Sequence, residues 1–164
     1  MAMRNILTGD EPRLRKKSRP VTEFNDRLHE LLDDMRETLL KADGVGLAAP
    51  QVGVLRRVVL VLDINIEAEN DEDKLIELVN PEIIEVSGEQ TGAEGCLSFP
   101  GQYGIVTRPD TVTVKAQDRY GKEFTVTGFG LTGRCFCHEI DHLDGIVFLD
   151  RVERMLTEEE LEED

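Results

Sequence analysis

The sequence predicts an α+β fold in which largely antiparallel β-sheets pack around a central helix carrying an HExxH motif, with another helix near the N-terminus. Three observations predict this fold class. A helical hydrophobic repeat comes early in the chain, several short segments with strand character follow it, and a second helical segment follows the strands. This order of helix, strands and helix favours helices packed on an antiparallel sheet.

The first expected element is a helix over residues 25–42. Its apolar residues recur at steps of three and four and line one face. They are Leu28, Leu31, Leu32, Met35 and Leu39. We expect Asn25 to cap the first turn through its side chain, and Gly44 to stop the helix because glycine tolerates the left-handed conformation. His29 lies off the apolar stripe and is expected at the surface.

Strand character dominates the middle of the chain. RVVLVLDI (57–64) is a β-branched run short enough to be a buried strand. The further expected strands are KLIELVN (74–80), EIIEV (82–86), TVTVKAQD (111–118) and KEFTVTGF (122–129). Asn80-Pro81 and Tyr120-Gly121 indicate turns between them, and this spacing suggests an antiparallel sheet.

The C-terminal part of the chain begins with a second helical segment, Leu131–Leu143, which Gly145 is expected to end before an apolar run at 146–149. The last stretch, TEEELEED (157–164), is a charge run with little to bury, expected as a frayed helical end or a disordered tail. A length of 164 residues without internal repeats predicts one domain over 1–164 that includes this acidic tail.

The composition restricts the class of partner. The chain has 34 acidic and 19 basic residues, a net charge of -15, so its field repels phosphate backbones and anionic lipid. We therefore expect no specific nucleic-acid partner and no membrane, and the basic run RLRKKSR (13–19) is read as a solvated loop. No apolar stretch resembles a membrane span or a secretory signal, and the three cysteines suit a reducing compartment, so we expect a cytoplasmic protein.

The motif His138-Glu139-Ile140-Asp141-His142 carries the sharpest chemical signal. Two histidines four residues apart lie on one face of a helix and can hold one metal ion. Glu139, next to the first of them, can reach a water on the same ion without being a ligand, as metal-assisted hydrolysis requires. The chain has only three histidines, so chance explains this pattern poorly.

A catalytic metal site usually has three protein ligands and an open position, so a third donor must come from elsewhere. Cys96 is the best candidate. It lies in EGCLSFP between strand segments, where Gly95 and Pro100 suggest a fixed loop. Spacing alone leaves equal room for a buried, apolar cysteine at this position.

The glycines of the segment from Gly44 to Gly46 leave room for a substrate backbone to approach, as an extended peptide paired with this segment would require. A simple helix stop and turn explains them better when they are taken alone. The segment is not a phosphate-binding loop, because it lacks the Gly-Lys-Ser/Thr ending and follows a helix rather than a strand.

Three separated motifs, GVGLAAPQ (44–51), EGCLS (94–98) and HEIDHLDG (138–145), occur in the order and approximate separation seen in peptide deformylases, and the chain resembles this family throughout, apart from its acidic tail. The resemblance implies a metal-dependent hydrolase acting on N-formylmethionyl peptides. Such an enzyme removes the formyl group from new polypeptides and releases formate, through attack by a metal-bound water assisted by a glutamate.

The resemblance also implies roles for individual residues. Cys96, His138 and His142 would bind the ion, while Glu139 would take a proton from the water and return it to the departing amine. The Gln51 side-chain amide and the Leu97 backbone N–H would stabilise charge on the formyl oxygen.

The implied substrate-binding residues are Gly44, Val45, Gly46, Leu131, Arg134 and Cys135. Of these, Val45, Leu131, Cys135 and the stem of Arg134 would form the methionine pocket, although core packing alone would also explain Val45 and Leu131.

The ligand types alone suggest zinc, whereas the resemblance implies native Fe²⁺, one ion per chain, with Ni²⁺, Co²⁺ or Zn²⁺ as substitutes.

Two features depart from the family pattern. Cys137 stands where many members have glutamine, and it points about 100 degrees away from His138 on a helix, so we expect it either beside the metal ligands without binding the ion or in a packing position. Relatives often have a longer, more basic C-terminal helix associated with docking near the ribosomal exit tunnel, so transient ribosome contact should be weakened by the acidic tail.

Two other functions compete with this interpretation. A zinc endopeptidase would share the two-histidine helix, but it would usually take a later glutamate or histidine as its third ligand, and no histidine follows His142. In a non-catalytic domain the ion would only join the helix to the sheet, or the pocket would only capture formylated peptides. Cys137 would then be the candidate fourth ligand that closes the site.

Overall fold

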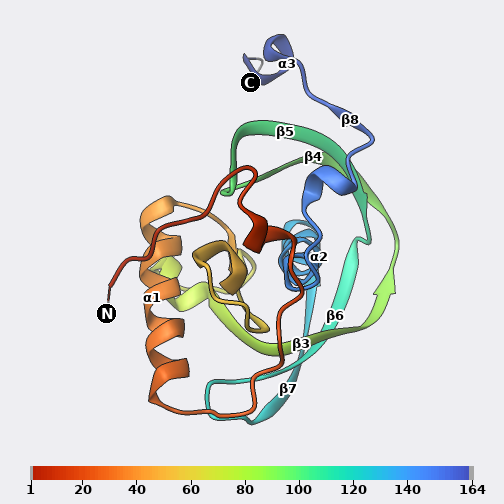
Figure 1. The fold of residues 1–164 in the computed structure, drawn as a ribbon. Helices are drawn as coiled ribbons and strands as arrows, with labels where there is room; N and C mark the ends of the chain where they lie inside the picture. The colour runs from red at the N-terminus through yellow and green to blue at the C-terminus, as the bar shows by residue number, and fades with distance from the viewer. Residues whose placement is uncertain (1, 163–164) are drawn as a thin grey trace.

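The helix α2 (Leu131–Leu143) lies in the middle of the molecule and is surrounded by strands, as the computed structural model of the chain shows (Figure 1). The structure describes residues 2–162. Two antiparallel sheets are present in these residues: five strands in the order β1-β2-β3-β6-β7, and three in the order β4-β5-β8. The predicted α+β architecture of antiparallel sheets around the histidine-bearing helix is confirmed.

The bounds of the elements are as follows. The larger sheet consists of β1 (Gly46–Ala48), β2 (Val58–Leu62), β3 (Leu75–Ser87), β6 (Thr111–Gln117) and β7 (Glu123–Phe129). The smaller sheet consists of β4 (Gln90–Cys96), β5 (Phe99–Arg108) and β8 (Arg154–Met155). The other helices are α1 (Asp26–Ala42), α3 (Glu158–Glu162) and the 3-10 turns η1 (Pro12–Arg15), η2 (Ala49–Val52), η3 (Asp71–Lys74) and η4 (Phe148–Asp150).

Strand β2 explains why the larger sheet is covered on both faces. Its side chains alternate: Val58 and Leu60 pack with the apolar stripe of α1, while Val59 and Val61 pack with α2. All five residues of the strand are therefore buried, which accounts for its continuous apolar run. This two-sided packing fixes α2 against the sheet, and α2 is the helix that carries the HExxH motif.

Helix α1 begins as predicted, but the residue that terminates it differs from the predicted one. The Asn25 side chain caps the first turn by accepting a hydrogen bond from the Leu28 backbone N–H. Asp43, with φ 55°, adopts the left-handed conformation at the C-terminal end, so the expectation that Gly44 would do so is wrong. A β-carbon at Gly44 would lie 2.8 Å from the Leu97 Cδ1 atom, so another residue there would require the Leu97 side chain to shift.

The dipeptide Asn80-Pro81 does not form the predicted turn. Strand β3 runs through it, with a register shift against β6 between Val79 and Glu82. Asn80 has a φ of 52°, and its side chain bonds to the Val21 backbone and to Gln117. These side-chain hydrogen bonds hold an irregularity inside one long strand, which the sequence alone presents as two strands and a turn.

Two further features differ from the expectations, and the acidic tail matches the helical end that was one of the two expected for it. Cys96 is the last residue of β4 rather than part of a loop, and β1, β4, β5 and β8 were not predicted. His29 is half-buried rather than on the surface, since its Nε2 atom lies 2.8 Å from the Arg119 carbonyl oxygen. The acidic tail forms the short helix α3 as far as Glu162, and residues 163 and 164 lie outside the described part.

None of the helices within residues 2–162 is both long enough and apolar enough to cross a lipid bilayer.

Candidate metal centre

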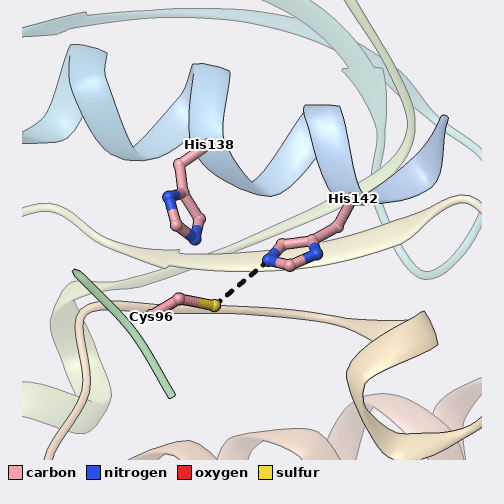
Figure 2. Close-up of side chains that lie close together, drawn as sticks. All are labelled: Cys96, His138 and His142. Carbon is pink, nitrogen blue, oxygen red and sulfur yellow. Dashed lines mark hydrogen bonds between the residues drawn. The ribbon is translucent and has the colours of Figure 1, made fainter. Parts of the chain in front are cut away.

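His138 and His142 project from the same face of α2 (Figure 2). Their positions four residues apart bring the two rings together, with centroids 5.1 Å apart. The exposed fractions of the side chains are 7% and 0%, because this face of the helix packs inside the molecule. The helix thus presents two imidazoles at the same buried position, as the sequence predicts.

Cys96 faces the two histidines from the end of β4 (Figure 2). The Cys96 Sγ atom lies 3.4 Å from His142 Nε2, and the donor atoms of all three residues lie within 4.8 Å of one another. A tetrahedral ion with metal–sulfur and metal–nitrogen bonds near 2.3 and 2.1 Å would need its ligands roughly 3.5 Å apart. The spacing and chemistry of these donors therefore suit one divalent cation.

Glu94 anchors one of the histidines, and the sequence analysis did not identify it. Its Oε2 atom lies 2.7 Å from His138 Nδ1, which leaves His138 Nε2 free to face the cation site. The signal was present in the sequence, because Glu94 and Cys96 are two residues apart, and alternate residues of a strand point to the same face. Recognising it required knowing that EGC is a strand.

Glu94 is a buried carboxylate surrounded by cations. Arg108 donates to both of its oxygens, at 3.1 and 2.6 Å, and Arg134 donates to Oε1 at 2.8 Å. Burial alone would raise the pKa of Glu94, but hydrogen bonds from His138 and Arg108 hold this pKa well below its usual range. Glu94 is therefore ionised and accepts the hydrogen bond from His138.

Glu139 lies beside the cation site with one oxygen available. Its Oε2 atom is 3.9 Å from His138 Nε2, and its buried Oε1 atom has no hydrogen-bond partner among residues 2–162. Burial raises the pKa of Glu139 to about 7, against the opposing effect of His138. A carboxyl group with this pKa can both accept and release a proton near neutral pH.

The surroundings of His138 are electrostatically suited to a cation. Burial alone would lower the pKa of this ring, but the Glu139 carboxylate and hydrogen bonds to Cys96 and Glu94 raise it well above its usual range. Negative groups thus stabilise positive charge at this position. Burial lowers the pKa of His142, which favours the neutral imidazole that binds metals.

A cavity of about 450 Å³ opens beside these residues. Its lining includes all six predicted substrate-binding residues, Gly44, Val45, Gly46, Leu131, Arg134 and Cys135. It also includes the predicted catalytic residues Gln51, Leu97 and Glu139, and the ligand candidates Cys96 and His138. His142 does not line the cavity. The structure therefore brings the predicted residues together around one space, from four separate segments of the chain.

Gln51 is held with its amide directed at the cation site. Its Oε1 atom accepts a hydrogen bond from the Ala48 backbone N–H, which fixes the orientation of the side chain. The Nε2 atom then lies 3.5 Å from Cys96 Sγ and 3.1 Å from Ser98 Oγ. Gln51 is only 1% exposed, so this donor is fixed before any ligand arrives.

Gly46 allows β1 to approach the acid/base candidate closely. A β-carbon at this position would lie 2.5 Å from Glu139 Oε2 and 2.6 Å from Cys135 Sγ. Any side chain there would displace Glu139 or the strand. The second glycine of GVG is therefore explained by the close packing of β1 against α2, beyond any role in a turn.

Cys137 packs into the core. It is 7% exposed and belongs to a buried cluster with Val61 and Val112, as expected for a packing residue. Among the described residues, the group of metal-binding donors consists of Cys96, His138 and His142 without Cys137. The site therefore has no fourth ligand from Cys137, as a purely structural metal site would have needed.

Comparison with known proteins agrees with this geometry. The polypeptide deformylase family model matches residues 3–158. A peptide deformylase of Caldicellulosiruptor bescii is 55% identical over 99% of this chain and 93% of its own length. The crystal structure of a peptide deformylase from Legionella pneumophila superposes with a TM-score of 0.85 at 47% identity, covering 93% of this chain and 87% of that one.

A third relative is a peptide deformylase from Acinetobacter baumannii, whose crystal structure contains Met-Ala-Ser. It superposes with a TM-score of 0.83 at 34% identity, over 92% of this chain and 98% of that one. Because the similarity extends over nearly the whole of both sequence and fold, the chain belongs to the peptide deformylase family.

Proposed function

We propose that Glu139 is the general acid/base of this enzyme, beside one divalent cation held by Cys96, His138 and His142. The chain is a peptide deformylase, a hydrolase that removes N-formyl groups. The observation that carries the assignment of roles is the convergence of the three donor atoms within 4.8 Å, next to a buried carboxyl group that lines the cavity. We propose that residues 1–164 form one catalytic domain.

The resident ion is proposed to be Fe²⁺, one per chain, with Ni²⁺, Co²⁺ or Zn²⁺ able to replace it. When bound, it would supply a Lewis acid that polarises the formyl group and lowers the pKa of the attacking water. The thiolate of Cys96 and the two imidazoles are donors that several of these metals accept, so the choice of iron rests on the family resemblance.

Glu139 is proposed to move the proton. Its Oε1 atom, which has no other partner among residues 2–162, can accept a proton from the attacking water. The same group can then protonate the nitrogen that leaves as the new N-terminal amine. A pKa raised to about 7 suits both steps, because the proton is neither held too tightly nor released too easily.

Gln51 and Leu97 are proposed to stabilise the charge that develops on the formyl oxygen. The Gln51 amide points toward Cys96, and Leu97 lines the same cavity. Donors that are already oriented cost little reorganisation when the charge appears. The hydrogen bond between Gln51 and Ala48 provides this orientation.

The cavity is proposed to take an N-formylmethionyl peptide in an extended conformation. Strands β1 and β4 each lie at the edge of their sheet, and residues of both line the cavity, so the peptide backbone can lie between them. Val45 and Leu131 are 40% and 43% exposed, which core packing does not explain and a pocket for methionine does. The Acinetobacter relative with Met-Ala-Ser bound is consistent with this substrate class.

The enzyme is proposed to act in the cytoplasm, with only weak contact to the ribosome. The acidic C-terminal tail and the net charge of -15 would be repelled by ribosomal RNA. We expect weak, salt-insensitive co-sedimentation with ribosomes. Tight binding that weakens steeply as salt is raised would contradict this part of the proposal.

The test of the proposed function is formate release from formyl-Met-Ala-Ser by protein purified without oxygen. Iron should be the bound metal, activity should disappear when a chelator removes it, and Fe²⁺, Ni²⁺ or Co²⁺ should restore activity better than Zn²⁺. Activity that survives complete metal removal would contradict the proposal. Cleavage of internal bonds in unmodified peptides without formate release would indicate an endopeptidase instead.

A further inference from the structure

A second cavity, of about 580 Å³, lies beside the start of α1 and shares no lining residue with the cavity at the metal centre. Four arginines line it, together with two carboxylates. These six residues are Arg4, Arg19, Arg27, Arg56, Glu23 and Glu30. No step of deformylation uses this cavity.

Three of the four arginines of this cavity differ from the others in the protein. Of the thirteen arginines in the sequence, ten form a salt bridge with a carboxylate. The other three, Arg19, Arg27 and Arg56, have no salt bridge within residues 2–162, and all three line this one cavity. The three guanidinium groups without an ion pair among the described residues thus gather at one cavity, although the chain has 34 acidic residues, and one anion could contact them together.

Arg19 and Arg56 are also backbone neighbours. They form an isolated parallel β-bridge, held by hydrogen bonds from Arg19 N to Leu55 O and from Arg57 N to Arg19 O. Residues paired in this way direct their side chains to the same side, and like charges in such positions destabilise the pair. An anion between the two guanidinium groups would convert this repulsion into attraction.

The rest of the lining indicates a small ligand with an apolar part. Val21, Leu28 and Leu31 contribute buried apolar surface to the cavity. Arg4, whose guanidinium is 2.9 Å from Asp34 Oδ2, adds a fourth cation near the other three. The net charge of -15 would repel a large polyanion such as RNA, which favours a small ligand.

We propose that this cavity binds a small phosphate monoester, with the phosphate between Arg19, Arg27 and Arg56 and the organic group on the apolar floor. The planar, forked guanidinium group matches phosphate oxygens in a bidentate manner, and a phosphate monoester carries close to two negative charges at neutral pH. It therefore satisfies several guanidinium groups at once.

The test is isothermal titration calorimetry of the metal-loaded enzyme with phenyl phosphate, inorganic phosphate and benzoate. Phenyl phosphate should bind more tightly than either of the others, because only it combines the phosphate with an apolar ring. The double substitution Arg19→Gln/Arg56→Gln should weaken its binding about tenfold or more, since each lost contact is a charge-assisted hydrogen bond. Arg27→Gln alone, at an exposed position of α1, should weaken binding severalfold and tests the site if the double variant does not fold.

The matched control is Lys41→Gln/Lys122→Gln, which removes the same charge from exposed positions outside the cavity. Its affinity for phenyl phosphate should equal that of the wild type, and formate release should be unchanged in every variant. Equal binding by wild type and Arg19→Gln/Arg56→Gln would overturn the proposal and place phenyl phosphate elsewhere. An equal loss of affinity for phenyl phosphate in the lysine control would overturn it as well. Binding of the peptide TEEELEED through these arginines, without binding of phenyl phosphate, would also overturn it and would identify the acidic tail of a second copy as the occupant.

Discussion

His138 donates a hydrogen bond from Nδ1 to Oε2 of Glu94, across 2.7 Å. The ionised carboxylate can only accept, so in the neutral ring that a metal ion requires the proton resides on Nδ1, and the lone pair of Nε2 is directed toward Cys96 and His142. A hydrogen bond of this kind fixes both the tautomer and the orientation of a metal-binding histidine. The cation site therefore depends on Glu94 as well as on its three donors.

Glu94→Gln should lower the affinity for the metal by about 10- to 100-fold, the usual cost of losing such an outer partner. Glutamine keeps the shape of the side chain but removes the charge that fixes the tautomer. Competition with a chelator measures the affinity, and Glu153→Gln serves as a control because Glu153 bonds only to Thr107 among the described side chains. Unchanged metal affinity in Glu94→Gln would show that Glu94 only supports Arg108 and Arg134.

Gly46→Ala should lower turnover, on the order of 100-fold, by displacing Glu139. The new β-carbon would come within 2.5 Å of the Glu139 carboxylate. Gly92→Ala on β4 is the matched control, because its β-carbon would meet its nearest neighbour at an ordinary 3.7 Å. Formate release and circular dichroism of both variants check this prediction, and a fully active Gly46→Ala enzyme would contradict the position assigned to Glu139.

Gln51→Ala should reduce kcat by about two orders of magnitude, corresponding to about 3 kcal/mol of lost transition-state stabilisation, with a smaller change in KM. The reason is that, in its proposed role, the amide acts on charge that appears only during the reaction. Ser98→Ala removes the partner of the same amide without removing the donor, and should retain most activity. A Gln51→Ala enzyme that loses only substrate affinity would place Gln51 in peptide binding alone.

The raised pKa of Glu139 predicts a pH dependence of stability in the metal-free protein. The folded group titrates at about 7 and the unfolded group at 4.5, so between these values the folded state retains a proton that the unfolded chain has lost. Stability should therefore fall as pH rises through this range. The difference in free energy of unfolding between metal-free Glu139→Gln and the metal-free wild type should therefore shift by about 2 kcal/mol in favour of the variant from pH 5.5 to pH 8.

Urea unfolding at the two pH values measures this difference. Asp141→Asn is the control, since that carboxylate is paired with Arg108 and Arg151 and should not produce the same gain. A constant difference between wild type and Glu139→Gln across the range would mean that the buried carboxyl group is not protonated in the folded protein.

Local patterns in the sequence predict the parts of the fold that local interactions determine. The repeat of α1, the strand β2 and the bounds Leu131–Leu143 of α2 were all predicted, as was the shared face of His138 and His142. Strand β4 was not, because QTGAEGC has two glycines and little β-branched character, and its conformation depends on pairing with β5. The contact of Glu94 with His138 was not predicted for the same reason, because Glu94 lies on β4.

Contacts between distant segments account for the remaining differences. Asn80-Pro81 has the composition of a turn, but side-chain hydrogen bonds to Val21 and Gln117 keep it within β3. The unpaired arginines of the second cavity come from three segments, and only the folded chain shows that they lie together. Arg19 belongs to a basic run that the sequence alone presents as a solvated loop.

The role of Glu139 is tested by the metal content and the rate of formate release of Glu139→Gln, purified without oxygen beside the wild type. The variant should retain one metal ion per chain, because Cys96, His138 and His142 are intact. Its turnover should fall by a factor of about 100 to 10,000, the range expected for loss of a general acid/base. Turnover close to that of the wild type, with the ion still bound, would contradict the role of Glu139.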